Sequence, residues 1–156
     1  MIKKQMILLI LGLFATLPTL AETCTPSANN CEYYRCMERS RSCGRNGYWQ
    51  DFAIPYCQKF VDDNAKFNTE SQRWLRDVRE CLQVRLGEVS ANSTCNQIKD
   101  AAMDSHVGCY VDTGFCSLAA ADQIKVMWYL KGAIRDWRTW KEADLLRQAC
   151  FQRGFR

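Results

Sequence analysis

Cysteine content is the feature that most constrains how this chain can fold. The sequence has 156 residues and 10 cysteines, and all ten follow residue 21. In a reducing compartment so many thiols would favour metal binding, whereas in an exported chain they favour disulfide bonds. Because the number is even, we expect five internal bridges and no free thiol. In the segment 57–116 cysteines alternate with apolar residues at helical spacing, which is typical of helices joined by disulfides.

The first residues predict export. Two lysines form a basic start, an apolar stretch follows over 6–14, and small residues precede a cleavage position ahead of Glu22. The apolar stretch is shorter than the roughly 20 residues of a membrane span, so we interpret 1–21 as a signal peptide and not as an anchor. The start suits a bacterial signal, and a eukaryotic signal is an open alternative. We expect a secreted protein, periplasmic if the source is bacterial, with one mature domain over 22–156.

Apolar residues at helical spacing predict an all-α fold, a small antiparallel bundle of about five to six disulfide-stapled helices. Pro55 should kink the second helix or mark its true start. Asp122 is expected to cap the fifth helix, and capping boxes are expected at 69–72 and 139–142. The helices are expected over about 32–41, 49–66, 69–87, 95–110, 122–137 and 139–151.

Few residues could carry catalysis or hold a metal. His106 is the only histidine, and with every thiol in a bridge no cysteine nucleophile is available. Secreted phospholipases need His followed by Asp and adjacent cysteines, but Val107 follows His106 and no two cysteines are adjacent. One histidine cannot build a zinc site, and Asp62-Asp63 lacks the alternating oxygen ligands of a calcium loop. We therefore expect a protein that is not an enzyme and that holds no metal and no cofactor. His106 is expected to lie half-exposed on a helix. An enzymatic function is only the third alternative.

Two further features bear on partners. Asn92-Ser93-Thr94 is a glycosylation acceptor in a predicted loop. Trp128, Trp137 and Trp140 form a late aromatic cluster, which is either core packing or an exposed surface for a protein partner. The net charge of +4 includes two lysines of the signal, which leaves +2 for the mature chain. This small charge gives no reason to expect nucleic acid or an anionic membrane as a partner.

The mature chain resembles the stanniocalcin family. The resemblance rests on the segment Ala65-Lys66-Phe67-Asn68-Thr69 joined to a ladder of cysteines, and it covers nearly the whole mature chain. The ladder reads Cys57-x2-Phe60, then Cys81-Leu82, Cys95, Cys109-Tyr110 and Phe115-Cys116-Ser117-Leu118-Ala119, with Cys31-x4-Cys36, Cys43 and Cys150 in the same register.

The resemblance implies a secreted, helix-rich, disulfide-bonded glycoprotein that is not an enzyme. Members of the family act as hormone-like factors in calcium and phosphate balance and as inhibitors of pappalysin-type metalloproteinases. Sequence alone cannot choose among the pairings that ten cysteines allow. The family pattern implies the pairs Cys24–Cys36, Cys31–Cys57, Cys43–Cys95, Cys81–Cys109 and Cys116–Cys150.

Three departures from the family pattern shape the functional expectation. Residues 49–55 look like an insertion between Cys43 and Cys57. The cysteine that joins two subunits in the family lies in a C-terminal region that has no counterpart after Cys150, and the additional cysteine by which one member attaches to its protease target has no counterpart either. Asn92 lies later than the family's glycosylation site. We therefore expect no disulfide-linked dimer, and any protease inhibition should be reversible. The main hypothesis is a secreted factor that acts by binding a protein. The alternative is an exported domain that binds an envelope or host protein without an endocrine role.

Overall fold

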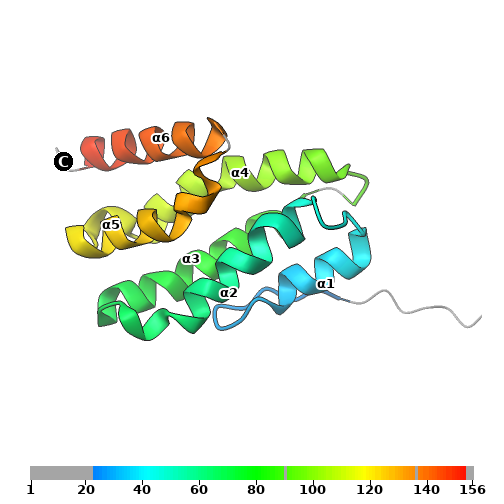
Figure 1. The fold of residues 1–156 in the computed structure, drawn as a ribbon, viewed down its shortest axis with the longest axis horizontal. Coiled ribbons are helices and arrows are strands. Elements are labelled where there is room, and N and C mark those ends of the chain that lie inside the picture. The colour runs from blue at the N-terminus through cyan, green and yellow to red at the C-terminus, as the bar shows by residue number, and fades with distance from the viewer. Residues whose placement is uncertain (1–22, 90, 136, 154–156) are drawn as a thin grey trace, which may run out of the picture.

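The computed structural model describes residues 23–89, 91–135 and 137–153, and the expected signal peptide over 1–21 lies outside the described residues. The expected all-α, disulfide-stapled bundle is confirmed: the described residues form six α-helices and four short helical turns, with no strand among them (Figure 1). In chain order the elements are α1 (Glu32–Arg41), η1 (Trp49–Ala53), α2 (Ile54–Asp62), η2 (Asn64–Lys66), α3 (Thr69–Gly87), α4 (Cys95–Asp112), η3 (Phe115–Ser117), α5 (Ala120–Tyr129), η4 (Leu130–Arg135) and α6 (Trp137–Arg153).

The long helices α3 and α4 pack on each other and form the centre of the bundle. On the outer side of α4 lies α6, which forms one edge of the molecule, while α1 lies at the opposite edge (Figure 1). The irregular arm before α1 is held by two side chains of α3. Ser27 N donates to Gln83 Oε1 at 2.7 Å, and Arg79 donates to the carbonyl of Ala28. The arm therefore lies against about one turn of α3.

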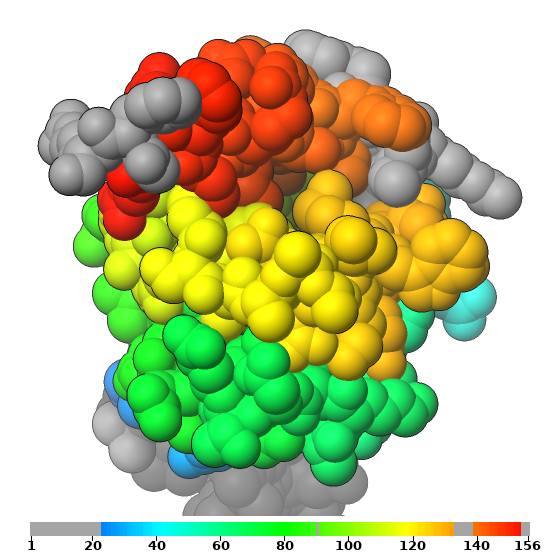
Figure 2. Space-filling model, turned by 90° about the vertical axis from the view of Figure 1, so that its left-hand side faces the viewer, coloured from blue at the N-terminus to red at the C-terminus, as the bar shows by residue number. Residues whose placement is uncertain are grey.

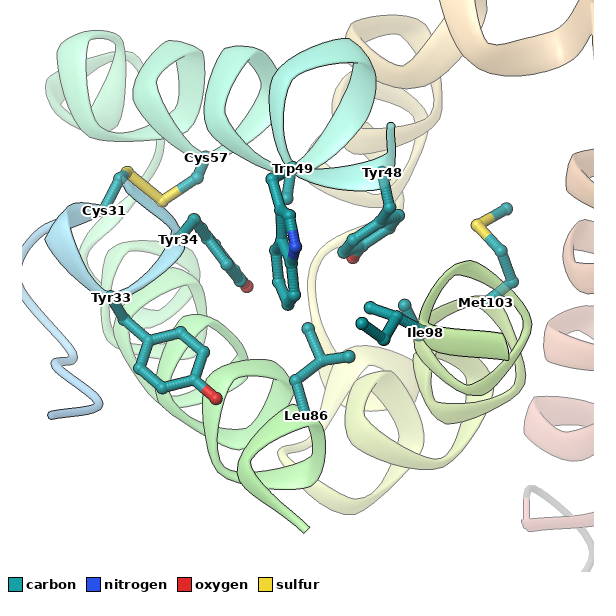
Figure 3. Packing of buried hydrophobic residues seen from close by; sticks show 11 residues of the cluster. Cys31, Tyr33, Tyr34, Tyr48, Trp49, Cys57, Leu86, Ile98 and Met103 are labelled. Atoms are coloured by element: carbon teal, nitrogen blue, oxygen red, sulfur yellow. A yellow bond between two sulfur atoms is a disulfide. The ribbon is translucent and has the colours of Figure 1, made fainter. Parts of the chain in front are cut away.

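Apolar side chains form two cores, one on each side of the bundle. In the first, Trp49 is 0% exposed and lies between Tyr34 and Tyr48, with Leu86 and Ile98 at its far edge (Figure 3). The ring centroids of Trp49 lie 6.0 Å from Tyr34 and 5.3 Å from Tyr48. The segment 49–55, which looks like an insertion in the sequence, therefore supplies the centre of a core.

Trp49 to Ala53 form a π-helical turn that runs directly into α2, with Pro55 in the first turn of α2. Ile54 N donates to the carbonyl of Trp49, five residues earlier. Proline has no N–H to donate to the carbonyl four residues before it, so it would break an ordinary α-helix. The wider turn changes the hydrogen-bond pattern just before Pro55, and the sequence expectation that α2 starts there is met without a sharp kink.

Phe60 and Phe67 lie seven residues apart, and the sequence predicts that they share one buried helix face, to which Ala65 also belongs. In the second core the two rings lie close together, with centroids 6.2 Å apart, but they do not lie on one continuous helix. The helix ends before Phe67, whose backbone is extended at ψ 155°. The chain turns through η2, and the ring of Phe67 then packs against both Phe60 and Tyr129. Ala65, expected in the buried face, is exposed.

Two expected helix caps are wrong, because the side chains have other partners. Helix α3 is capped by Asn68, whose side chain accepts from Ser71 N at 2.8 Å, and not by Thr69. Asp122 lies inside α5, whose cap position is Ala119 without a side-chain bond. Its carboxylate accepts instead from Lys125 Nζ at 2.8 Å and from Asn68 N at 3.2 Å. A tertiary contact between α5 and the start of α3 thus replaces the local cap.

The capping box expected at 139–142 is also wrong, since α6 begins at Trp137 and Thr139 is buried inside it. A capping box does occur at the start of α4, where Thr94 Oγ1 accepts from Gln97 N and the Gln97 side chain accepts from Thr94 N. The fifth helix is shorter than expected: α5 ends at Tyr129, and the 3₁₀ turn η4 follows.

Candidate functional site

Five disulfides join elements that are distant in the sequence, and they pair the same cysteines that the family resemblance implies. Cys81–Cys109 links the middle of α3 to the end of α4, and Cys116–Cys150 links η3 to α6. The others are Cys24–Cys36, Cys31–Cys57 and Cys43–Cys95. Among the described residues no cysteine is free, so the described part of the chain offers no thiolate for catalysis or metal binding.

His106 is buried, at 5% exposure, and the expectation of a half-exposed helix residue is wrong. Its Nδ1 lies 3.2 Å from Glu142 Oε2, so the contact joins α4 to α6. Phe52 and Tyr110 pack on the imidazole, with ring centroids at 5.6 and 6.0 Å. A buried polar group requires such a partner, which explains why the helices meet here. The histidine holds α6 on the bundle.

Tyrosines line a cavity of about 60 Å³ in the middle of the bundle, next to His106. Burial raises the pKa of Tyr34, Tyr48 and Tyr110 above the ordinary value, so these phenols stay protonated at neutral pH. A second cavity of about 30 Å³ lies on the other side of His106, toward α6. Both spaces are much smaller than the roughly 300–1,000 Å³ of a typical small-molecule pocket.

The acidic pair at 62–63 has partners within the chain. Asp63 accepts from Lys66 Nζ at 2.6 Å and from the Tyr129 hydroxyl at 2.8 Å. These two hydrogen bonds hold the pKa of the Asp63 carboxyl below its ordinary value. Across the part of the chain that the structure describes, no three His, Cys, Asp or Glu side chains gather as a metal site would need. In the same residues, no helix combines the length and apolarity needed to cross a bilayer.

Exposed apolar side chains gather on α5 and α6. Trp128 and Trp140 are 63% and 62% exposed, and Ile124, one helical turn before Trp128, is 69% exposed. Of the two interpretations of the aromatic cluster, the exposed surface therefore applies to Trp128 and Trp140, while the side chain of Trp137 lies outside the described residues. Figure 2 shows α5 and α6 side by side across the middle and top of one end of the molecule.

One lysine lies against the exposed ring of Trp128. Lys131 Nζ lies 3.6 Å from the centroid of the Trp128 ring, a cation–π contact that holds the indole in place. An ordered, exposed indole with a cation over one face is suited to burial against a protein partner. Asn92 of the predicted glycosylation acceptor is exposed in the turn before α4, on a different part of the surface.

A family model described as "Stanniocalcin family" matches residues 16–132, well over half of the chain. The chain belongs to the stanniocalcin family. No curated protein and no solved structure matches it. Stanniocalcins are secreted, hormone-like proteins and not enzymes, and five disulfides fit an extracellular location. The matched segment includes α1 to α5 and ends before α6.

Sequence reasoning missed two features of this stanniocalcin-family chain. Glu142 was assigned to a cap, but it is the partner of His106. Ile124 and Phe151 belong to helices that the sequence predicts, but the sequence does not indicate that both side chains lie on the surface. The i, i+4 spacing of Ile124 and Trp128 does signal a shared face, although it does not say whether that face is buried.

Proposed function

We propose that this chain is a secreted stanniocalcin-family factor that acts by binding another protein, either as a hormone-like signal or as a reversible inhibitor of a metalloproteinase. Family membership supports the class of protein. The observation that carries the binding role is the exposed aromatic surface of α5 and α6, marked by Trp128 and Trp140. Contiguous exposed apolar residues on a stable scaffold are typical of an interaction site.

In this proposal the partner contacts the surface that contains Trp128 and Trp140. Tryptophan is enriched among residues whose truncation weakens protein complexes, because one side chain covers a large area with few rotatable bonds. The Cys116–Cys150 bridge joins η3, just before α5, to α6, so it limits how far α5 and α6 can move relative to each other. A surface held in this way loses less entropy on binding. Since the described cysteines are all bridged, the contact is non-covalent.

The test is capture of the partner from conditioned medium, or from periplasm if the source is bacterial, with a photo-reactive residue at position 124. Cross-linked proteins are identified by mass spectrometry, and Trp128→Ala serves as the surface variant. A partner that is cross-linked by the parent chain and lost with Trp128→Ala supports the proposal. Inhibition of a pappalysin-type metalloproteinase is measured in parallel with both chains. Equal capture by both chains would show that Trp128 does not contribute to binding, and absence of any cross-linked partner from position 124 would contradict a binding role for this surface.

Export and glycosylation belong to the same proposal. A chain processed as proposed has Glu22 as its first residue, which N-terminal sequencing of the secreted protein determines. Asn92 is exposed, as a glycan acceptor must be. If the source secretes through a eukaryotic pathway, treatment with an N-glycosidase reduces the mass of the parent chain and leaves the mass of Asn92→Gln unchanged.

A further inference from the structure

Three tyrosine side chains from separate parts of the chain line the central cavity of about 60 Å³. Tyr34 belongs to α1, Tyr48 directly precedes η1, and Tyr110 belongs to α4. Tyr34 and Tyr48 are each 3% exposed, and Figure 3 shows their hydroxyl ends directed inward from opposite sides of Trp49. We call this space the phenol cavity.

The three hydroxyls have protons to donate but no acceptor in the surrounding protein. Among the described residues, no hydrogen bond joins the Oη atoms of Tyr34, Tyr48 and Tyr110 to another residue. Burial, followed by neighbouring charges, raises the pKa of all three phenols, so each keeps its proton at neutral pH. Buried polar groups in proteins are almost always hydrogen-bonded. The acceptor for these hydroxyls is therefore expected inside the cavity.

One positive charge borders the phenol cavity. Arg79 lines it, is 6% exposed, and donates to the backbone carbonyl of Ala28. Burial lowers the pKa of the Arg79 guanidinium, and the neighbours that modify this shift are Tyr34 and Arg76, neither of which is negatively charged at neutral pH. A guanidinium that has left water without meeting an opposite charge is costly to bury. An anion in the cavity would offset that cost.

The lining of the phenol cavity suits a negative ligand. No aspartate or glutamate of the described residues lines it. The charge of Glu142 adds, after burial, to the raised pKa of Tyr48 and Tyr110. Glu142 nevertheless lines the second cavity and lies 3.2 Å from His106 Nδ1. Since His106 borders both cavities, its imidazole separates the Glu142 carboxylate from the phenol cavity.

We propose that the phenol cavity binds one small monovalent anion such as chloride. The hydroxyls of Tyr34, Tyr48 and Tyr110 donate hydrogen bonds to the ion. The guanidinium of Arg79 supplies the opposite charge, and one positive group matches one negative charge. The size also fits, because one water needs about 10–15 Å³ of cavity volume and a chloride ion is only slightly larger than a water molecule. A space of about 60 Å³ holds such an ion but not a nucleotide or a peptide.

A bound anion would connect parts of the fold that are distant in the sequence. It would contact α1, the residue before η1, α3 and α4, and through Arg79 it would support the arm that carries Ala28. A ligand that binds only the folded chain stabilises it increasingly as the ligand concentration rises. This inference goes beyond the proposed function, because it concerns an ion inside the bundle and not a protein on the surface of α5 and α6.

Thermal unfolding of the mature chain, with all bridges intact, tests the proposal at constant ionic strength. Sodium gluconate is replaced stepwise by sodium chloride at a total of about 0.2 M, so that screening stays the same while the small anion increases. Gluconate is too large for the cavity. We expect the unfolding midpoint to rise by about 3–6 °C, which corresponds to a dissociation constant on the order of 10 mM.

Three variants assign the effect to the phenol cavity. Tyr48→Phe removes one donor and keeps the ring, so it should reduce the chloride-dependent rise to less than about half. Arg79→Met removes the charge and keeps a long side chain, and it should abolish the rise. Tyr33→Phe is the matched control, because Tyr33 is 2% exposed and adjacent to Tyr34 but does not line the cavity. Each variant is compared with itself in gluconate, so a general loss of stability does not change the readout.

Crystals of the parent chain soaked in sodium bromide locate the ion, because bromide scatters anomalously. We expect an anomalous peak within hydrogen-bond distance of Tyr34 Oη or Tyr48 Oη. A midpoint that does not depend on chloride, with only water in the cavity, overturns the proposal. A chloride effect of full size in both Tyr48→Phe and Arg79→Met, or bromide bound only at the surface, also overturns it. Either result leaves the proposed function standing.

Discussion

Phe67→Ala tests whether the turn through η2 is held in place by a packed ring. Phe67 is 3% exposed and contacts Phe60 and Tyr129, with centroid distances of 6.2 and 5.6 Å. Lys125 Nζ lies 4.8 Å from the ring centroid and adds a cation–π contact. Burying about 150–250 Å² of ring surface at about 25 cal/mol per Å² gives an upper estimate of about 4–6 kcal/mol. Measured Phe→Ala losses in cores are about 3–5 kcal/mol, and we expect a loss in that range.

The assay is urea unfolding at pH 7 with the disulfides intact, followed by tryptophan fluorescence. Lys66→Gln is the matched control, because Lys66 is the neighbouring residue, its side chain is 65% exposed, and its ion pair with Asp63 lies at the surface. Exposed ion pairs contribute about 0–1 kcal/mol, so this variant should unfold near the parent midpoint. A loss below about 1 kcal/mol for Phe67→Ala, or a larger loss for Lys66→Gln, would refute the reasoning about this core.

Three other predictions concern stability. Cys81→Ala should lower the unfolding free energy by about 2–5 kcal/mol, measured by urea unfolding, because it removes the one disulfide that joins α3 directly to α4 and leaves buried Cys109 free to mispair. An unchanged midpoint would contradict this. Thr94→Ala should cost about 0.5–2 kcal/mol by the same assay, through loss of the cap on α4, and no loss would show that the capping box contributes nothing. Burial raises the pKa of Asp122, but the hydrogen bonds from Lys125 and Asn68 N outweigh it and hold the pKa below 3.8. The carboxylate therefore stabilises the fold above about pH 4, and this contribution is lost as the pH falls through its folded pKa. Asp122→Asn should accordingly make the free energy of unfolding less dependent on pH on the acid side, and an unchanged acid slope would exclude this role.

Much of the fold could be predicted from the sequence, because helices depend on local spacing. The apolar repeat of residues such as Trp74, Leu75 and Val78 places α3 correctly, and these side chains are buried. Caps were less predictable, since several adjacent residues can accept the same N–H. At the start of α3 the extended backbone of Phe67 and Asn68 decides between Asn68 and Thr69, and that backbone depends on tertiary packing.

Contacts between distant residues carried no local signal. His106 and Glu142 are 36 positions apart and meet only because α6 packs on α4. The disulfide pairing came from the family resemblance and could not come from spacing, because ten cysteines allow many pairings. The sequence did not decide whether Trp128 and Trp140 are buried in the core or exposed on the surface. Spacing shows which residues share a helix face, but when both sides of a helix are partly apolar it does not show which face is buried.

The order of the bridges along the chain determines what a protease can do to this protein. Cys24–Cys36 overlaps Cys31–Cys57, which overlaps Cys43–Cys95, which in turn overlaps Cys81–Cys109, so a single cut between 24 and 109 releases no fragment. A cut between 116 and 150 also leaves its two ends joined. Between Cys24 and Cys150, only the short segment from Cys109 to Cys116 lies outside every bridged loop. Cleavage there, near the turn at Gly114, would separate the α5–α6 surface from the rest of the molecule, so one peptide bond can divide binding surface from scaffold.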